Sequence, residues 1–137
     1  MNAIDTNVLV YRFDRSEPVK RAIAKQLLNG LAAAGDTVLP WQVAVELMRQ
    51  LSAWRHLGLL TPTGVRRLMI TVRRWYPISL PTEPCLDRAL QYAEVYSLSH
   101  WDSLIIAACA EVGVTTLYTE DMGAPRIIDT VELVNPF

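Results

Sequence analysis

The stretch AIDTNVLV (residues 3–10) decides how this chain begins to fold. Ala3 and Ile4 can start a buried strand, and Asp5 ends it after very few residues. The apolar run that follows, residues 8–13, favours a short helix or turn directly behind the acid. Asp5 therefore has two explanations: it can cap that helix, because Asp is favoured at the N-cap, or it can belong to a site at the end of a sheet.

Length and composition predict one globular domain over residues 1–137. Hydrophobic residues make up 51% of the chain and charged residues 20%, which is typical of a packed core and not of a disordered protein. The net charge of −1 indicates no particular class of partner. The basic residues are nevertheless uneven, with many Arg and few Lys, and Arg is the better bidentate ligand for phosphate.

The chain carries no pattern for a membrane or an oxidising compartment. The longest apolar run, residues 104–110, is far shorter than the roughly 20 residues that a membrane span needs. Asp5, Arg12 and Asp14 interrupt any apolar leader. Cys85 and Cys109 cannot form a disulfide framework or a zinc spacing. We therefore expect a soluble cytoplasmic protein with two buried thiols.

Short apolar runs alternate with longer helical patterns along the whole chain. Such alternation favours βαβ units and a parallel sheet. We expect strands at residues 3–4, 37–39, 78–80, 114–118 and 131–134, and helices at 17–34, 41–57, 62–75, 83–96 and 100–111. The predicted fold class is α/β, a three-layer α/β/α sandwich with a central, mostly parallel five-stranded sheet.

Four acids stand where such a fold would place a site, beyond the carboxyl ends of its strands. Asp5 follows the first strand and Asp121 follows the fourth. Asp102 lies in the first turn of the helix at 100–111. Glu46 lies on the border of the apolar stripe of the helix at 41–57, where it can face a neighbouring element.

Each of these acids also has an ordinary structural explanation. Asp102 fits a capping box with Ser99, Asp121 is a common turn residue, and Glu46 can be a solvated helix side chain. If the four converge, however, they repel one another unless a cation neutralises them. Carboxylate oxygens suit Mg²⁺ or Mn²⁺, and no cluster of His and Cys offers a competing zinc site.

Five segments together resemble the PIN domain, and among PIN domains the VapC toxins, the ribonuclease components of toxin–antitoxin modules. The segments are AIDTNVLVYRFD, VAVELMRQL, LSHWDSLIIAACA, LYTEDM and VELVNPF, and they span nearly the whole chain. The resemblance implies a catalytic and metal-binding site made by Asp5, Glu46, Asp102 and Asp121. It also implies that Thr6, Asn7 and Thr119 are supporting polar groups, and that Glu120 points away.

The resemblance implies a metal-dependent endoribonuclease toxin of a type II toxin–antitoxin system, which cleaves RNA with a water activated by Mg²⁺ or Mn²⁺. The alternative is a catalytically inactive PIN-like module that binds RNA or protein; such modules usually lose acids that this chain keeps. Phosphatases and receiver domains that phosphorylate an Asp fit less well, since position 7 is Asn and no acid pair precedes a mid-chain strand.

RNA binding requires positive charge, and two groups of Arg are candidates. Arg73 and Arg74 repeat Arg66 and Arg67 two turns later on one predicted helix, which forms either an RNA-binding strip or a solvated face. Arg12 and Arg15 follow the first acid closely and are candidates to reach a phosphate.

The resemblance also implies protein partners. These are a cognate antitoxin, whose tail would use apolar surface around Trp41, Trp54 and residues 57–60, and a second copy in a homodimer.

Overall fold

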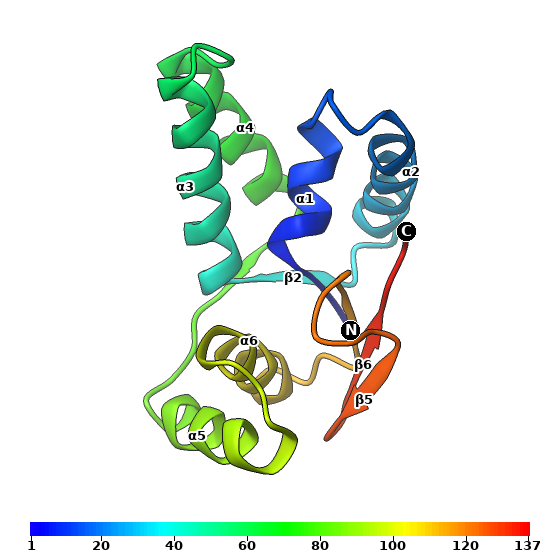
Figure 1. Ribbon diagram of the computed structural model, residues 1–137, viewed down its shortest axis with the longest axis vertical. Coiled ribbons are helices and arrows are strands. Elements are labelled where there is room, and N and C mark those ends of the chain that lie inside the picture. Colours follow the sequence, from blue (N-terminus) through cyan, green and yellow to red (C-terminus); the bar gives the residue numbers. More distant parts are fainter.

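The computed structural model describes residues 1–137 as a layered α/β fold (Figure 1). The helices are α1 (Thr6–Phe13), α2 (Pro18–Ala34), α3 (Trp41–His56), α4 (Pro62–Trp75), α5 (Pro84–Tyr96) and α6 (His100–Glu111). The strands are β1 (Asn2–Ile4), β2 (Thr37–Pro40), β3 (Ile78–Ser79), β4 (Thr116–Tyr118), β5 (Arg126–Ile128) and β6 (Val131–Val134).

The six strands form one sheet in the order β3-β2-β1-β4-β6-β5. All neighbours pair in parallel except β5 and β6, which are antiparallel. Helices α1 to α4 lie on one side of the sheet, and α5 and α6 lie on the other (Figure 1). The prediction of an α/β/α sandwich with a mostly parallel sheet is therefore confirmed.

The predicted number of strands was one too low, because the sequence analysis missed β5. This strand has only three residues, and Ile128 alone among them is buried. It therefore carries no alternating pattern that a sequence could reveal. Its pairing with β6 at the sheet edge makes it a strand.

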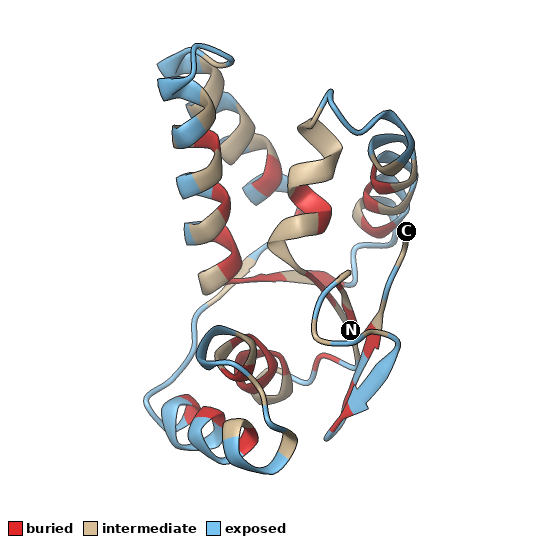
Figure 2. Ribbon diagram, in the orientation of Figure 1, coloured by how far each residue is buried: buried red, intermediate tan, exposed pale blue.

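The core lies on both faces of the sheet and along the helix surfaces that face it (Figure 2). Helix α6 is buried almost continuously from Ile105 to Cys109, since it packs between the sheet and α5. Cys85 and Cys109 are buried free thiols, as expected. No helix is long and apolar enough to cross a membrane.

The register of the central strands brings two chain segments together at one edge of the sheet. Ile4 of β1 pairs with Tyr118 of β4, and the next backbone N–H, that of Asp5, donates to the Tyr118 carbonyl at 2.9 Å. The segments that follow β1 and β4 therefore leave the sheet side by side. Helix α3 begins directly after β2 at the same edge.

One buried hydrogen bond joins α2 to the end of α4, and it provides a test of the packing. The hydroxyl of the fully buried Tyr76 donates to the Leu28 carbonyl at 2.6 Å. Tyr76→Phe is expected to lower the free energy of unfolding by about 1 kcal/mol, because it removes one buried hydrogen bond. Urea denaturation measures the change. Tyr96→Phe is the matched control, and a change of equal size in both variants would contradict the expectation.

Candidate active site

Asp5 stands between the end of β1 and the start of α1, and its carboxylate receives hydrogen bonds from three directions. It is the N-cap of α1, and its Oδ1 accepts from the Thr6 N–H at 2.6 Å. Its Oδ2 accepts from Thr119 Oγ1 at 2.7 Å and from Asn7 Nδ2 at 3.1 Å. The capping role is thus real, but it engages only one of the two carboxylate oxygens.

Asn7 connects Asp5 to Asp121. Its Nδ2 lies 2.9 Å from Asp121 Oδ2 and 3.3 Å from Thr119 Oγ1. Thr119 also accepts from the Asp121 N–H at 3.0 Å, which fixes the turn after β4. Asn7 and Thr119 therefore hold two acids, 116 positions apart in the sequence, on one polar network.

Glu46 reaches the same region from α3. Thr6 Oγ1 donates to Glu46 Oε2 at 2.9 Å, and Gln42 Nε2 donates to Glu46 Oε1 at 3.0 Å. The same Gln42 nitrogen lies 3.1 Å from the Trp101 carbonyl oxygen. Glu46 is therefore half-buried and fixed on both oxygens; it is not a freely solvated helix side chain.

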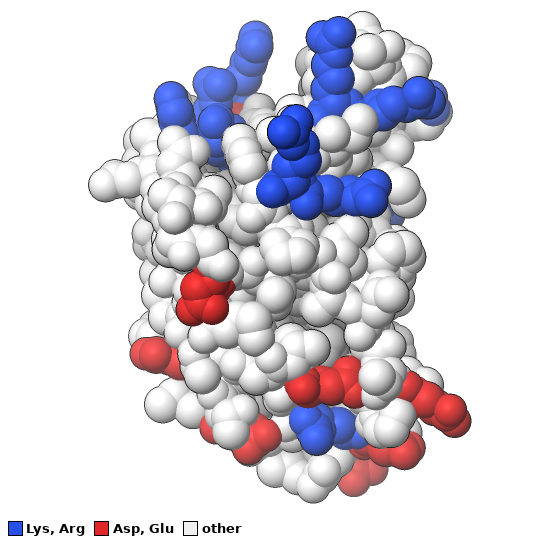
Figure 3. Space-filling model, turned by 180° about the vertical axis from the view of Figure 1, so that it is seen from behind, with Lys and Arg blue, Asp and Glu red and all other residues white.

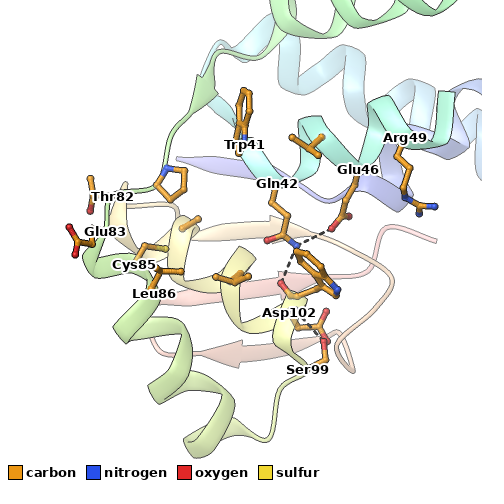
Figure 4. Close-up of a pocket in the computed structure, with 15 residues that line it drawn as sticks. Trp41, Gln42, Glu46, Arg49, Thr82, Glu83, Cys85, Leu86, Ser99 and Asp102 are labelled. Atoms are coloured by element: carbon orange, nitrogen blue, oxygen red, sulfur yellow. Dashed lines mark hydrogen bonds between the residues drawn. The ribbon is translucent and has the colours of Figure 1, made fainter. Parts of the chain in front are cut away.

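Asp102 lies apart from this network. Its backbone N–H donates to Ser99 Oγ at 3.2 Å, which is the capping interaction expected at the start of α6. Its side chain lines a groove that Glu46 also lines (Figure 4). No three Asp, Glu, His or Cys side chains are close enough to form a ready-made metal cluster. The structure thus links Asp5 with Asp121 through Asn7, and it places Glu46 within hydrogen-bond distance of Thr6. Asp102 belongs to neither contact, and it shares only the lining of the groove with Glu46.

The electrostatics of the site are dominated by Asp5. Burial raises the pKa of its carboxyl group to about 6, although the hydrogen bonds from Thr119 and Thr6 oppose this shift. The negative charges of Asp121 and Glu46 also raise this pKa. Asp121 and Glu46 therefore oppose a negative charge on Asp5, and this repulsion favours a positively charged ligand.

The donor set fits a hard divalent ion. Besides the carboxylates, the Asn7 Oδ1 atom is buried and accepts no hydrogen bond. A buried oxygen without a donor is unfavourable unless a ligand, ion or water satisfies it. Asp5, Asp121 and Asn7 therefore offer oxygen ligands of the kind that Mg²⁺ and Mn²⁺ prefer.

Glu120 points away from the site, as the resemblance implied. Its Oε2 accepts from Lys20 Nζ at 2.6 Å and its Oε1 accepts from Tyr11 OH at 2.7 Å. The Lys20 ammonium also lies over the rings of Tyr11 and Phe137, 4.4 and 5.4 Å from their centroids. This cluster anchors the residue next to Asp121 and the C-terminal Phe137 to the helices α1 and α2.

The candidate RNA-binding arginines lie away from the acids. Arg12 is in the last turn of α1, about 10 Å along the helix axis from Asp5. Burial raises the pKa of Tyr76 to about 12, and the nearby charge of Arg12 opposes this shift. Arg15 is exposed just beyond that helix. Arg73 and Arg74 are exposed in the last turn of α4. On the face seen in Figure 3, most Lys and Arg side chains lie in the upper half and most Asp and Glu side chains in the lower half.

Sequence reasoning missed several residues that complete the site. Gln42 lies four positions before Glu46, and this spacing alone indicates a helical side-chain pair. The sequence could not indicate that Lys20 and Tyr11 bind Glu120, because Glu120 is about 100 residues away from them. Trp101 lies next to Asp102, but nothing in the sequence indicates a role for it.

Comparison with known proteins identifies the family. The PIN domain family matches residues 3–128, and the chain therefore belongs to the PIN domain family. No curated protein sequence matches the chain closely enough to add a relative.

Solved structures share the fold at low sequence identity. A toxin–antitoxin complex from Klebsiella pneumoniae has a TM-score of 0.71 at 18% identity, covering 100% of this chain and 98% of that one. VapBC2 from Rickettsia felis, bound to a DNA fragment from its promoter, has a TM-score of 0.70 at 16% identity and 96% coverage of both chains. Mycobacterium tuberculosis VapC20, a sarcin-ricin loop cleaving toxin, has a TM-score of 0.64 at 15% identity, with 90% and 92% coverage. At these identities the likeness establishes the fold.

The position of Asn7 between two acids provides a test of the site. Asn7→Asp replaces the shared amide donor with a third carboxylate, and it is expected to lower the free energy of unfolding in chelator by about 1–3 kcal/mol. Thermal and urea denaturation measure the loss. Asn29→Asp, at an exposed position of α2, is the matched control and should change stability little. Equal stability of both variants would show that Asn7 is not an essential donor.

Proposed function

We propose that residues 1–137 form a single PIN domain that acts as a metal-dependent endoribonuclease toxin of a type II toxin–antitoxin system. The reaction is hydrolysis of RNA phosphodiester bonds by a metal-activated water. The catalytic and metal-binding residues are Asp5, Glu46, Asp102 and Asp121, supported by Thr6, Asn7 and Thr119. The cofactor is Mg²⁺ or Mn²⁺.

The observation that carries this proposal is the network that joins Asp5, Asn7 and Asp121. It places two acids from the ends of neighbouring parallel strands on one amide group, beside an amide oxygen with no donor. A structural cap needs only one acid, whereas two acids held on one amide group favour a cation site. Nucleases of the PIN family generally depend on divalent metals, which agrees with this donor set.

The protein residues have separate tasks in this chemistry. Asp5 and Asp121 would hold the cation, and Asn7 and Thr119 fix the orientation of these two carboxylates. Thr6 and Gln42 aim the Glu46 carboxylate toward the same space. A divalent ion bound there supplies an activated water and neutralises charge that develops on the phosphate. No Ser or His nucleophile is then required.

The similar solved structures support a proposal for the substrate class and the partners. VapC20 of M. tuberculosis is a toxin that cleaves the sarcin-ricin loop, and RNA is the substrate we propose for this chain. The candidate phosphate contacts are four arginines. Arg73 and Arg74 are exposed on α4, Arg12 lies in the last turn of α1, and Arg15 lies just beyond that helix. Mapping the 5′ ends of cellular RNA after induction of the protein would identify the target.

An antitoxin partner is proposed because two of the similar structures are toxin–antitoxin complexes. Of the apolar residues expected to receive its tail, Trp41, Leu57 and Leu59 are exposed. Trp54 and Leu60 pack against the core instead, so they cannot form most of that surface. We also propose a homodimer, and this proposal rests on the family resemblance alone.

The first test is RNA cleavage. Asp5→Asn is expected to lower the rate of cleavage about 100-fold or more, because it removes the buried charge that would hold the ion. Cleavage of total RNA by purified protein in Mn²⁺ measures it. Glu94→Gln, at an exposed position of α5, is the matched control. Full activity of Asp5→Asn would contradict the proposal.

The second test is metal binding without any RNA. A saturating ion, at about 100 times its dissociation constant, stabilises a protein by about 2.7 kcal/mol. Mn²⁺ is therefore expected to raise the melting temperature of the wild-type protein, and chelator should reverse the effect. Asp5→Asn should show little or no stabilisation. If the wild-type protein gains no stability, the inactive PIN-like binding module becomes the better interpretation.

The third test concerns the basic helix α4. If Arg73 and Arg74 contact phosphates, replacing both with Ala should reduce the slope of log affinity against log salt by about 1.4 for single-stranded RNA. Fluorescence anisotropy across a salt series measures the slope. Arg88→Ala on α5 changes the charge at a distant helix and serves as the control. An unchanged slope in the double variant would assign these arginines to a solvated face.

A further inference from the structure

A groove of about 1000 Å³ runs between α3 on one side and α5 and α6 on the other (Figure 4). Trp41, Gln42, Glu46 and Arg49 of α3 line it, with Gln42 and Glu46 extending toward α6, and Asp102 lies on its α6 wall (Figure 4). Two of the four proposed catalytic acids, Glu46 and Asp102, are thus part of its lining. The groove is therefore a continuation of the acidic site and not a separate pocket.

Trp101 lines this groove directly beside Asp102. Its side chain is 61% exposed, although an exposed indole gains nothing from core packing. Its backbone is held in place because Gln42 Nε2 donates to the Trp101 carbonyl and to Glu46 Oε1. The His100 ring packs edge-on against the indole at 4.9 Å between centroids. Trp101 is therefore an exposed aromatic side chain on a fixed backbone, tied through one amide to a proposed catalytic acid.

The groove has a mainly apolar lining that also carries Glu46, Glu83 and Asp102, and it contains the groups that a nucleobase subsite uses. An aromatic face, a side-chain amide and the Arg49 guanidinium stand within one lining. Stacking on an aromatic ring with polar groups nearby is how proteins bind the bases of single strands. An RNA strand cleaved at the proposed four-acid site must also place neighbouring nucleotides close to Glu46 and Asp102, because these nucleotides are covalently joined to the reacting phosphate.

We propose that this groove is a nucleobase subsite, in which a base flanking the cleaved bond of single-stranded RNA stacks on the indole of Trp101. The inference rests on the proposed function for the location of the cleaved bond. It adds a substrate-binding residue that lies outside the acidic site, and it makes Gln42 the positioning residue that couples this subsite to Glu46.

The test uses the full chain and two labelled strands of about eight nucleotides, a mixed-sequence RNA and an abasic strand of equal length and charge. Fluorescence anisotropy in chelator measures binding while metal-dependent cleavage is prevented. The wild-type protein should bind the RNA about tenfold more tightly than the abasic strand, a typical effect of stacking one base. Trp101→Leu should abolish this difference, and Trp101→Phe, which keeps an aromatic face, should retain most of it.

The outcomes separate this subsite from the proposed activity. Cleavage of RNA by a wild-type protein that binds both strands equally would overturn the subsite and leave the activity standing. Base-dependent binding through Trp101 in a protein that cleaves no RNA would support the subsite and contradict the activity. If Trp101→Leu leaves RNA binding unchanged but alters the oligomeric state in sedimentation, the groove is a protein contact and the proposal fails.

Discussion

The hydrogen bond from the Asp5 N–H to the Tyr118 carbonyl is the constraint on which the rest of the site depends. It closes the parallel pairing of β1 and β4 at the residue where the first acid stands. Because the two strands end together, the segment after β4 must run beside the start of α1. Thr119 can then donate to Asp5, and Asn7 can reach Asp121. A shift of one residue in this register would turn these side chains to the other face of the sheet.

A capping acid and a site acid need not be alternatives, and Asp5 shows why. Its Oδ1 accepts from the first turn of α1, so the partial positive charge of the helix N-terminus stabilises the carboxylate. Its Oδ2 faces Thr119 and Asn7. Burial and the nearby acids act against ionisation. The fold thus holds an acid rigidly in a place where it repels its neighbours, which is favourable only when positive charge is supplied.

The acidic groups and the candidate basic contacts lie on different elements of the fold. The acids and the groove between α3 and α6 lie at the carboxyl edge of the sheet, whereas Arg73 and Arg74 lie in the last turn of α4, which leads into β3. Lys20, Glu120 and Phe137 form a cluster directly beside Asp121, because Glu120 precedes Asp121 in the sequence.

The sequence by itself determined the fold class, the order of nearly all elements and the positions of the four acids, because strand ends, helix periods and caps are local properties. It could not reveal β5, whose three residues become a strand only by pairing with β6. Nor could it show that Gln42 reaches Trp101, that Lys20 turns Glu120 away, or that Asp102 stands apart from the network of Asp5. Only the tertiary structure decided these features. Each depends on the distance between residues far apart in the chain, and strand order and helix packing set that distance.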